Sequence, residues 1–188
     1  MKLHRWIFPS LKIGITLTVL GIAFVGCSSS NGSSAQNPTK SSPVLPVARN
    51  PIANASTSAG LEIGEVLVEN NENAAGKAVD DHLEIALANV GPSELSGFEI
   101  FYTFTDRKTK ESESYYFELP AGFTIPTGGR RVAHFDNTGA TDHFPVNDFS
   151  LYKTSTNAQD VRVLVSAPGV APATATVKKD KGGPEEAD

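Results

Sequence analysis

The sequence predicts an all-β domain, an antiparallel sandwich of seven or eight short strands. Apolar residues recur at every second position in several stretches, which is the pattern of half-buried strands. Turn-forming Gly, Pro and Asn clusters separate these stretches at short intervals. No window of about 11 residues shows the apolar stripe of an amphipathic helix. Short strands without long crossover connections favour antiparallel pairing in two packed sheets.

The strands are expected in order along residues 61–178, which is a normal length for one domain. The clearest alternation places Leu83, Ile85 and Leu87 on one face of a strand, and Val161, Val163 and Val165 on one face of another. The expected strands lie near residues 61–69, 82–89, 95–106, 112–119, 129–135, 149–153, 160–166 and 172–178. The expected core includes Ile85, Leu87, Phe98, Ile100, Tyr102, Phe117 and Val163. Burial of each large apolar side chain contributes about 1.5–3 kcal/mol, so such a set can stabilise a domain of this size.

Two segments flank this domain. Residues 27–60 are rich in Ser and Pro and contain no aromatic residue, so we expect a disordered tether with an r.m.s. span of about 30 Å. The alternative for residues 43–52 is an extended arm that packs on the domain. Residues 179–188 end in Glu185, Glu186 and Asp188, and we expect an acidic disordered tail.

Residues 1–26 have the organisation of an export signal. Lys2, Arg5 and Lys12 precede an uncharged apolar run from residue 13 to residue 25, which is shorter than the roughly 20 residues of a membrane-spanning helix. The run ends in Phe24-Val25-Gly26-Cys27 and resembles a bacterial lipoprotein signal peptide, with Phe24 where that family usually has leucine. The resemblance implies that Cys27 is lipidated and becomes the first residue of the mature chain. The alternatives are a short uncleaved membrane anchor and an ordinary signal peptide that is cleaved elsewhere.

Charge and cysteine content limit the partners. Cys27 is the only cysteine, so the exported domain contains no internal disulfide. Residues 1–26 contain three basic and no acidic residues, so residues 27–188 contain 13 basic and 21 acidic residues, a net charge of −8. This balance argues against binding to nucleic acid and against docking on anionic lipid headgroups, because both need basic clusters.

The domain also resembles known extracellular modules. The segment from Leu83 to Phe104, with its Asn89-Val90-Gly91 turn, is similar to the strand, turn and strand of immunoglobulin-like modules. Residues 119–135, with Pro120, Gly122, Pro126 and Gly128 before a strand, are similar to lamin-tail-type domains, which are also immunoglobulin-like sandwiches. The resemblance implies an immunoglobulin-like fold and carries over no catalytic residues.

Two histidines and two carboxylates lie close together in the sequence and are the candidates for a metal site. They are His134, Asp136, Asp142 and His143. A loop that folds back could bring these N and O ligands together, and Asp136, Asn137 and Asp142 could offer oxygens to calcium. The alternative is an ordinary hairpin turn, because the spacing matches no strong metal motif.

The candidate binding surface combines aromatic and basic residues: Tyr115, Tyr116, Arg130 and Arg131. Adjacent strand residues face opposite sides, so one tyrosine is expected to be buried and the other exposed. An exposed tyrosine beside an arginine could stack on a sugar ring or anchor a protein partner. The alternative is cross-strand packing, with an arginine stem covering apolar surface.

The function expected from these features is non-catalytic. The sequence lacks a Gly-x-Ser-x-Gly nucleophile motif, and the expected lipid occupies the only thiol. We expect a lipoprotein that is held in the cell membrane through Cys27, faces the extracytoplasmic side and presents its domain to an envelope protein or polymer. No enzymatic activity and no cofactor are expected. The alternative is a small-molecule or metal-binding lipoprotein attached to a transport or redox system.

Overall fold

The computed structural model describes residues 44–69 and 83–182. Its elements are almost entirely strands, as predicted. They are β1 (Leu61–Val68), β2 (Leu83–Asn89), β3 (Glu99–Asp106), β4 (Ser112–Glu118), β5 (Arg130–Phe135), β6 (His143–Phe144), the one-turn helix α1 (Leu151–Thr154), β7 (Gln159–Ser166) and β8 (Ala173–Lys179). In this part of the chain no helix is long and apolar enough to cross a membrane.

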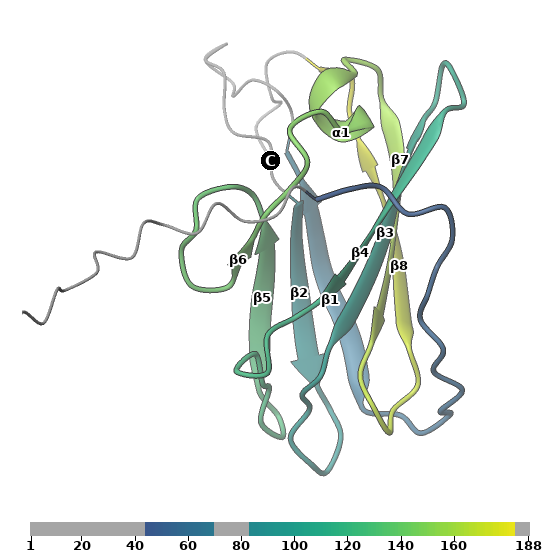
Figure 1. The fold of residues 1–188 in the computed structure, drawn as a ribbon. Coiled ribbons are helices and arrows are strands. Elements are labelled where there is room, and N and C mark those ends of the chain that lie inside the picture. Colours follow the sequence, from purple (N-terminus) through teal and green to yellow (C-terminus); the bar gives the residue numbers. More distant parts are fainter. Residues whose placement is uncertain (1–43, 70–82, 183–188) are drawn as a thin grey trace, which may run out of the picture. The chain divides into compact units, whose positions relative to one another are not determined.

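The strands form two four-stranded sheets that pack face to face (Figure 1). One sheet has the order β1-β2-β5-β6 and the other has the order β4-β3-β7-β8. Strands β1, β2 and β5 therefore share one sheet, while β3 and β7 are neighbours in the other. Immunoglobulin-like sandwiches have this arrangement. The predicted all-β sandwich with seven or eight strands is confirmed.

One pair departs from the expected antiparallel pattern, because β6 pairs in parallel with β5 over two residues. The chain reverses between them through a loop in which Gly139 and Asp142 have positive φ values of 70° and 64°. The backbone N–H of His134 donates to the carbonyl of Asp142 at 2.9 Å. This short loop returns the chain so that His143 lies beside His134 in the register.

The core lies between the two sheets and consists of the inward-facing residues of every second position. All the core residues predicted from the sequence are buried except Phe117, which is partly buried and packs against the others. Aromatic rings form its centre: the ring centroid of Tyr102 lies 5.2 Å from that of Phe135, and Phe104 stacks on Tyr152 at 4.7 Å. No disulfide is needed to join the sheets, because this apolar layer already does so.

The strand predicted near residues 149–153 is wrong, since the chain forms α1 there. Ser150 is the N-cap of α1, and its hydroxyl accepts the backbone N–H of Lys153 at 3.3 Å. A Ser cap favours helix initiation, while the three apolar residues Phe149, Leu151 and Tyr152 suggested a strand. The helix buries Tyr152 at one end of the sandwich, which we call the α1 end.

Residues 44–60, for which the sequence predicts a disordered tether, instead lie along the sandwich; we call this segment the strap. It has no strand or helix, yet hydrogen bonds join it to the sheets at several points. The N–H of Val47 donates to the carbonyl of Ser114 in β4 at 2.8 Å, and the carbonyl of Ser58 accepts the N–H of Ala171 at 2.7 Å. The strap crosses the outer side of the β4-β3-β7-β8 sheet before it enters β1 (Figure 1). The strap is therefore held by backbone hydrogen bonds and not by an alternating apolar pattern, and only such a pattern could have been recognised in the sequence.

A second boundary also differs by one residue, because Lys179 belongs to β8 and not to the predicted tail. Its side chain is buried, and its ammonium group donates to the carbonyl of Tyr152 at 2.9 Å. It also lies 4.6 Å from the centre of the Tyr152 ring, a cation–π contact that helps to compensate for burial of the charge. Cys27, the predicted signal segment and the rest of the predicted tether lie outside the described residues.

Candidate functional site

The outer face of the β4-β3-β7-β8 sheet carries a row of large side chains. Phe101 of β3 pairs with Tyr116 of β4 on one side and with Leu164 of β7 on the other, so the three lie side by side. Each is only partly buried, although the outward positions of a sandwich are usually polar. This row therefore presents apolar surface on the solvent side of the sheet.

Two carboxylates border the aromatic row. The hydroxyl of Tyr116 lies 2.7 Å from an oxygen of Glu99 and 3.0 Å from an oxygen of Glu118. Burial and these two neighbouring carboxylates raise the pKa of Tyr116, so the phenol stays protonated and acts as a donor. On the other side of the row, the hydroxyls of Thr103 and Ser114 are hydrogen-bonded at 2.8 Å. The face thus combines one aromatic row with acceptors on one side and hydroxyls on the other.

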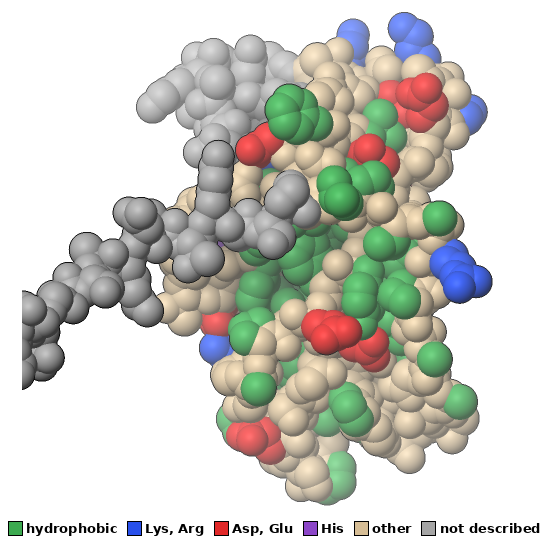
Figure 2. Space-filling model, in the orientation of Figure 1, with side chains coloured by type: hydrophobic (Ala, Val, Ile, Leu, Met, Phe, Trp, Pro, Cys, Tyr) green, Lys and Arg blue, Asp and Glu red, His purple; other side chains and the backbone are tan. Residues whose placement is uncertain are grey.

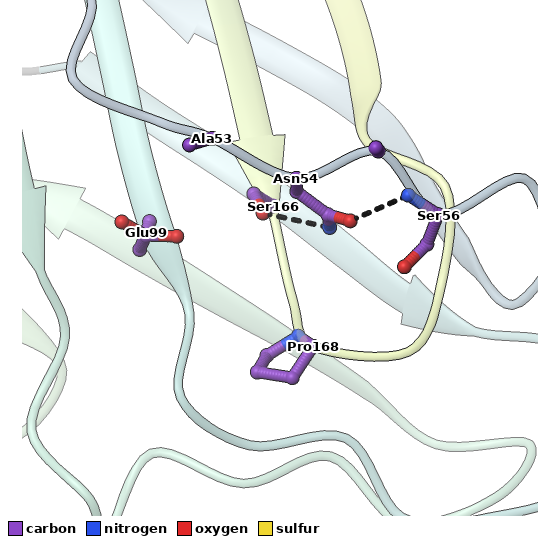
Figure 3. A pocket seen from close by; sticks show the side chains of 7 residues that line it. Ala53, Asn54, Ser56, Glu99, Ser166 and Pro168 are labelled. Atoms are coloured by element: carbon purple, nitrogen blue, oxygen red, sulfur yellow. Dashed lines mark hydrogen bonds between the residues drawn. The ribbon is translucent and has the colours of Figure 1, made fainter.

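The strap adds a wall to this face and borders two hollows. The larger has a volume of about 510 Å³ and is open to solvent (Figure 3). It is lined by Ala53, Asn54, Ala55, Ser56, Glu99, Ser166 and Pro168. The smaller, of about 170 Å³, is lined by Asn50, Phe101, Thr103, Arg162 and Leu164. Both hollows therefore lie where the strap and the sheet face meet.

Asn54 holds the strap against this sheet. Its side-chain NH₂ group lies 3.0 Å from Oγ of Ser166, 3.0 Å from the carbonyl of Ala167 and 2.9 Å from the carbonyl of Val170. Its side-chain oxygen accepts the N–H of Ser56 at 2.9 Å (Figure 3). The larger hollow therefore has a fixed wall, because one side chain joins the strap to the end of β7.

The four residues of the predicted binding surface do not form one surface. Tyr115 points into the core, where its ring lies 5.5 Å from that of Tyr102, and its neighbour Tyr116 points outward. Arg130 and Arg131 belong to β5 in the other sheet. The sequence could show the alternation of the tyrosines, but the pairing of β5 with β2 separates the arginines from them.

The Arg131 side chain is held by contacts within the domain. It donates two hydrogen bonds to the carboxylate of Asp142, at 2.8 and 2.7 Å, and its guanidinium lies 4.3 Å from the centre of the Phe123 ring. The hydrogen bonds with Asp142 raise the pKa of Arg131. This arrangement agrees with the alternative interpretation, in which an arginine covers apolar surface. Arg130 is exposed on the same strand.

The predicted metal candidates come together, but their donor atoms do not converge. The rings of His134 and His143 stack with centroids 4.4 Å apart and an interplanar angle of 9°. Nitrogen lone pairs lie in the ring plane, so two parallel rings direct them side by side and not at one ion. Asp142 is bound to Arg131, as described above. In the described ranges, no group of three or more His, Cys, Asp and Glu side chains is arranged to hold a metal ion.

Asp136 stabilises the loop between β5 and β6. Its carboxylate accepts hydrogen bonds from the N–H and hydroxyl of Thr138, at 2.9 and 2.8 Å, and lies 2.6 Å from Nδ1 of His143. Burial alone would raise the pKa of Asp136, but the hydrogen bonds from Thr138 and His143 outweigh it and lower the pKa. The loop that suggested a metal site is therefore closed by its own hydrogen bonds.

Sequence reasoning missed the main parts of the outer face. Phe101 could have been found, because it is an aromatic residue at the outward position of an otherwise alternating strand. Asn54 has no such signal, since it lies among small and polar residues in a segment without periodicity. Its importance depends on three acceptors that are more than 100 positions away in the chain.

Comparisons with known proteins identify no family. No protein-family model and no curated protein matches the sequence. Among solved structures, a Pseudomonas fluorescens alkylpurine DNA glycosylase bound to DNA is similar over 64% of this chain and 30% of its own, with 17% identity and a TM-score of 0.38. A red sea bream transglutaminase matches over 64% of this chain and 16% of its own, with 11% identity and a TM-score of 0.36. A CARDB domain from Pyrococcus furiosus, in complex with di-metal ions, matches over 70% of this chain and 97% of its own, with 9% identity and a TM-score of 0.33. The chain thus spans less than a third of the first two proteins, and these TM-scores support no functional comparison.

Proposed function

We propose that this chain is a lipid-anchored envelope protein whose β-sandwich presents a non-catalytic binding surface outside the cytoplasmic membrane. Cys27, the only cysteine, carries the lipid, and the segment after it connects the membrane to the strap. The binding surface is the outer face of the β4-β3-β7-β8 sheet. Its partner is an envelope protein or polymer with hydroxyl or amide donors, which match the carboxylates on this face.

The row formed by Tyr116, Phe101 and Leu164 is the observation that carries the binding role. Exposing aromatic rings to water on an outward sheet face is unfavourable, and such rings can stack on a sugar ring or an apolar side chain of a partner. Glu99 and Glu118 lie at the edge of the row and can accept hydrogen bonds from a ligand. The strap hollows give this face a concave border, which a flat sheet lacks.

The lipid anchor is tested by replacing Cys27 with alanine in a bacterial host. We expect the unchanged chain in the membrane fraction, with an intact mass that shows cleavage before Cys27 and a lipid on its sulfur. The C27A variant should lose the lipid and the cleavage at this position, because the thiol is the acceptor. A mature chain with unmodified Cys27, or an intact N-terminus in the unchanged protein, would contradict the anchor.

The binding surface is tested with a photo-crosslinking amino acid at position 116. We expect a discrete crosslinked product in native membranes, because Tyr116 belongs to the outward row that carries the proposed surface. The control carries the same amino acid at position 130, since Arg130 is exposed on the opposite sheet. Equal products from both positions, or none from position 116, would show that this face does not bind the partner.

A further inference from the structure

Phe149 is unusually exposed for a large apolar side chain, with 86% of its surface open to solvent. Its backbone is nevertheless held in place, because its N–H donates to the side-chain oxygen of Asn147 at 2.9 Å and the next residue, Ser150, caps α1. Asn147 is itself fixed, since its NH₂ group donates to the hydroxyl of Tyr115 at 3.1 Å. The fold therefore directs this ring outward at the α1 end.

The same end carries a hollow lined by cationic side chains, with a volume of about 360 Å³. Its lining consists of Arg107, Lys108, Asn157, Ala158 and Lys181. Backbone hydrogen bonds hold its parts together: the N–H of Arg107 donates to the carbonyl of Ala158, and the N–H of Gly182 donates to that of Thr156, both at 2.9 Å. At this end of the molecule Lys and Arg side chains lie together with Asp and Glu side chains, beside exposed apolar side chains near α1 (Figure 2).

Asp106 and Asp160 lie near this hollow without lining it, and the exposed Asp180 precedes Lys181 in the chain. Asp106 is saturated by four donors, which are the N–H groups of Lys108 and Thr109 and the side chains of Ser155 and Asn157. Its charge thus holds the turn together. Asp160 lies 3.7 Å from Arg107, but both side chains are about half exposed, so this ion pair is weak and easily exchanged for another anion. The three cationic side chains are therefore available to an anionic group of a ligand.

The strap starts close to the α1 end. Val47 is bonded to Ser114, the third residue of β4, and β4 begins at the α1 end. Leu45, two residues earlier, is 68% exposed. Only 16 residues, 28–43, separate Val44, the first residue of the strap, from Cys27. A chain of 16 residues reaches at most about 55 Å when fully extended.

We propose that the α1 end docks on the surface of the bilayer in which Cys27 is anchored. Phe149 inserts among the lipid headgroups, and the hollow between Arg107, Lys108 and Lys181 receives headgroup phosphates. An aromatic side chain beside lysines and arginines is the composition of interfacial membrane-binding surfaces. The proposal rests on the proposed lipid anchor, which keeps this end near the bilayer.

This docking revises an expectation drawn from composition. The net charge of −8 after residue 26 argued against contact with anionic headgroups, yet three cationic side chains line one hollow at the α1 end. The docking also fixes the orientation of the sandwich relative to the membrane. The larger strap hollow lies at the opposite ends of β3 and β7, beside Glu99 and Ser166, so it would face away from the membrane.

A single tryptophan can report the docking. The only tryptophan, Trp6, lies in the signal segment, so the mature chain contains none and Phe149→Trp introduces a unique fluorophore. The matched control is Val90→Trp, because Val90 is 55% exposed in the turn after β2, at the opposite end of the sandwich. Each lipidated full chain is reconstituted in vesicles of phosphatidylethanolamine and phosphatidylglycerol that contain a nitroxide-labelled lipid.

We expect the emission at position 149 to shift to shorter wavelength and to be quenched about twofold by the labelled lipid, while emission at position 90 stays nearly unchanged. The double change Lys108→Glu and Lys181→Glu should abolish most of this quenching, whereas Arg130→Glu in the other sheet should not. Equal quenching at positions 149 and 90 would overturn the docking, and quenching unaffected by Lys108→Glu and Lys181→Glu would overturn the phosphate contacts.

Flotation and mass measurement of the same samples separate this proposal from the anchor. A chain that is lipidated and floats with the vesicles but shows no quenching at position 149 would leave the anchor in place and show that docking is wrong. A chain with unmodified Cys27 that does not float would show that both proposals are wrong.

Discussion

Replacing Phe135 with alanine is expected to lower the free energy of unfolding by about 3–5 kcal/mol. The ring is fully buried in β5, and its centroid lies 5.2 Å from that of Tyr102, 5.1 Å from that of Phe117 and 5.6 Å from that of Phe144. These neighbours come from both sheets, so the surrounding side chains cannot collapse into the cavity without moving strands. Because typical domains are stable by only about 5–15 kcal/mol, the loss should be visible as a large shift in the urea midpoint.

The matched control is the same change at Phe149, which is exposed. We expect Phe149→Ala to alter the free energy of unfolding by less than about 0.5 kcal/mol, since the ring makes no core contact. Circular dichroism in urea measures both variants. A loss at Phe135 no larger than the loss at Phe149 would show that the two sheets do not share the aromatic core described above.

Replacing Asn54 with alanine is expected to release the strap. The change removes the donor group that faces Ser166, Ala167 and Val170, and the loss of such partly buried hydrogen bonds costs about 1–3 kcal/mol. Arg49 lies in the strap and is exposed, so trypsin can report the release by cleaving after it. Each 1.4 kcal/mol of lost local stability should speed this cleavage about tenfold, because cleavage requires the strap to detach.

Asn50→Ala is the control for this experiment. Asn50 lies in the same strap, but its side-chain oxygen accepts only a local, exposed hydrogen bond, from the N–H of Ile52. We expect cleavage after Arg49 to stay within about twofold of the unchanged chain, since exposed local hydrogen bonds contribute little. Equally fast cleavage of the Asn50 and Asn54 variants, or no acceleration in the Asn54 variant, would mean that Asn54 does not hold the strap.

The strands were predictable because each is encoded by the alternation of apolar and polar residues within its own segment. Every second residue of β2, β3 and β7 is buried, and all of these are apolar except Asn89, Asp106 and Gln159 at the strand ends. Period two therefore identifies each strand and the face that it buries. The short helix α1 was not predictable in the same way. Its single turn is specified by the cap at Ser150, while its apolar residues fit either a strand or a helix.

The candidate site was predictable only in part, because its residues meet through pairing between distant strands. Tyr116 was identified from the sequence, but its neighbours Phe101 and Leu164 join it only through the register of β4, β3 and β7. The arginines predicted to accompany it lie in the other sheet. Register between strands is set by the whole core, so the sequence near Tyr116 does not contain this information.

The sequence by itself determined the all-β class and the position of most strands, and it is also the source of the prediction that a lipoprotein signal ends at Cys27. These features depend on periodicity, composition and short motifs, which are local properties of the chain. Only the tertiary structure decided where the domain begins, which residues form its outer face and which cationic side chains line the hollow at the α1 end. The strap depends on hydrogen bonds from Asn54 and Val47 to residues far along the chain, and the cationic hollow depends on three segments that meet at the α1 end. Such contacts follow from packing of the complete fold, and no local pattern in the sequence encodes them.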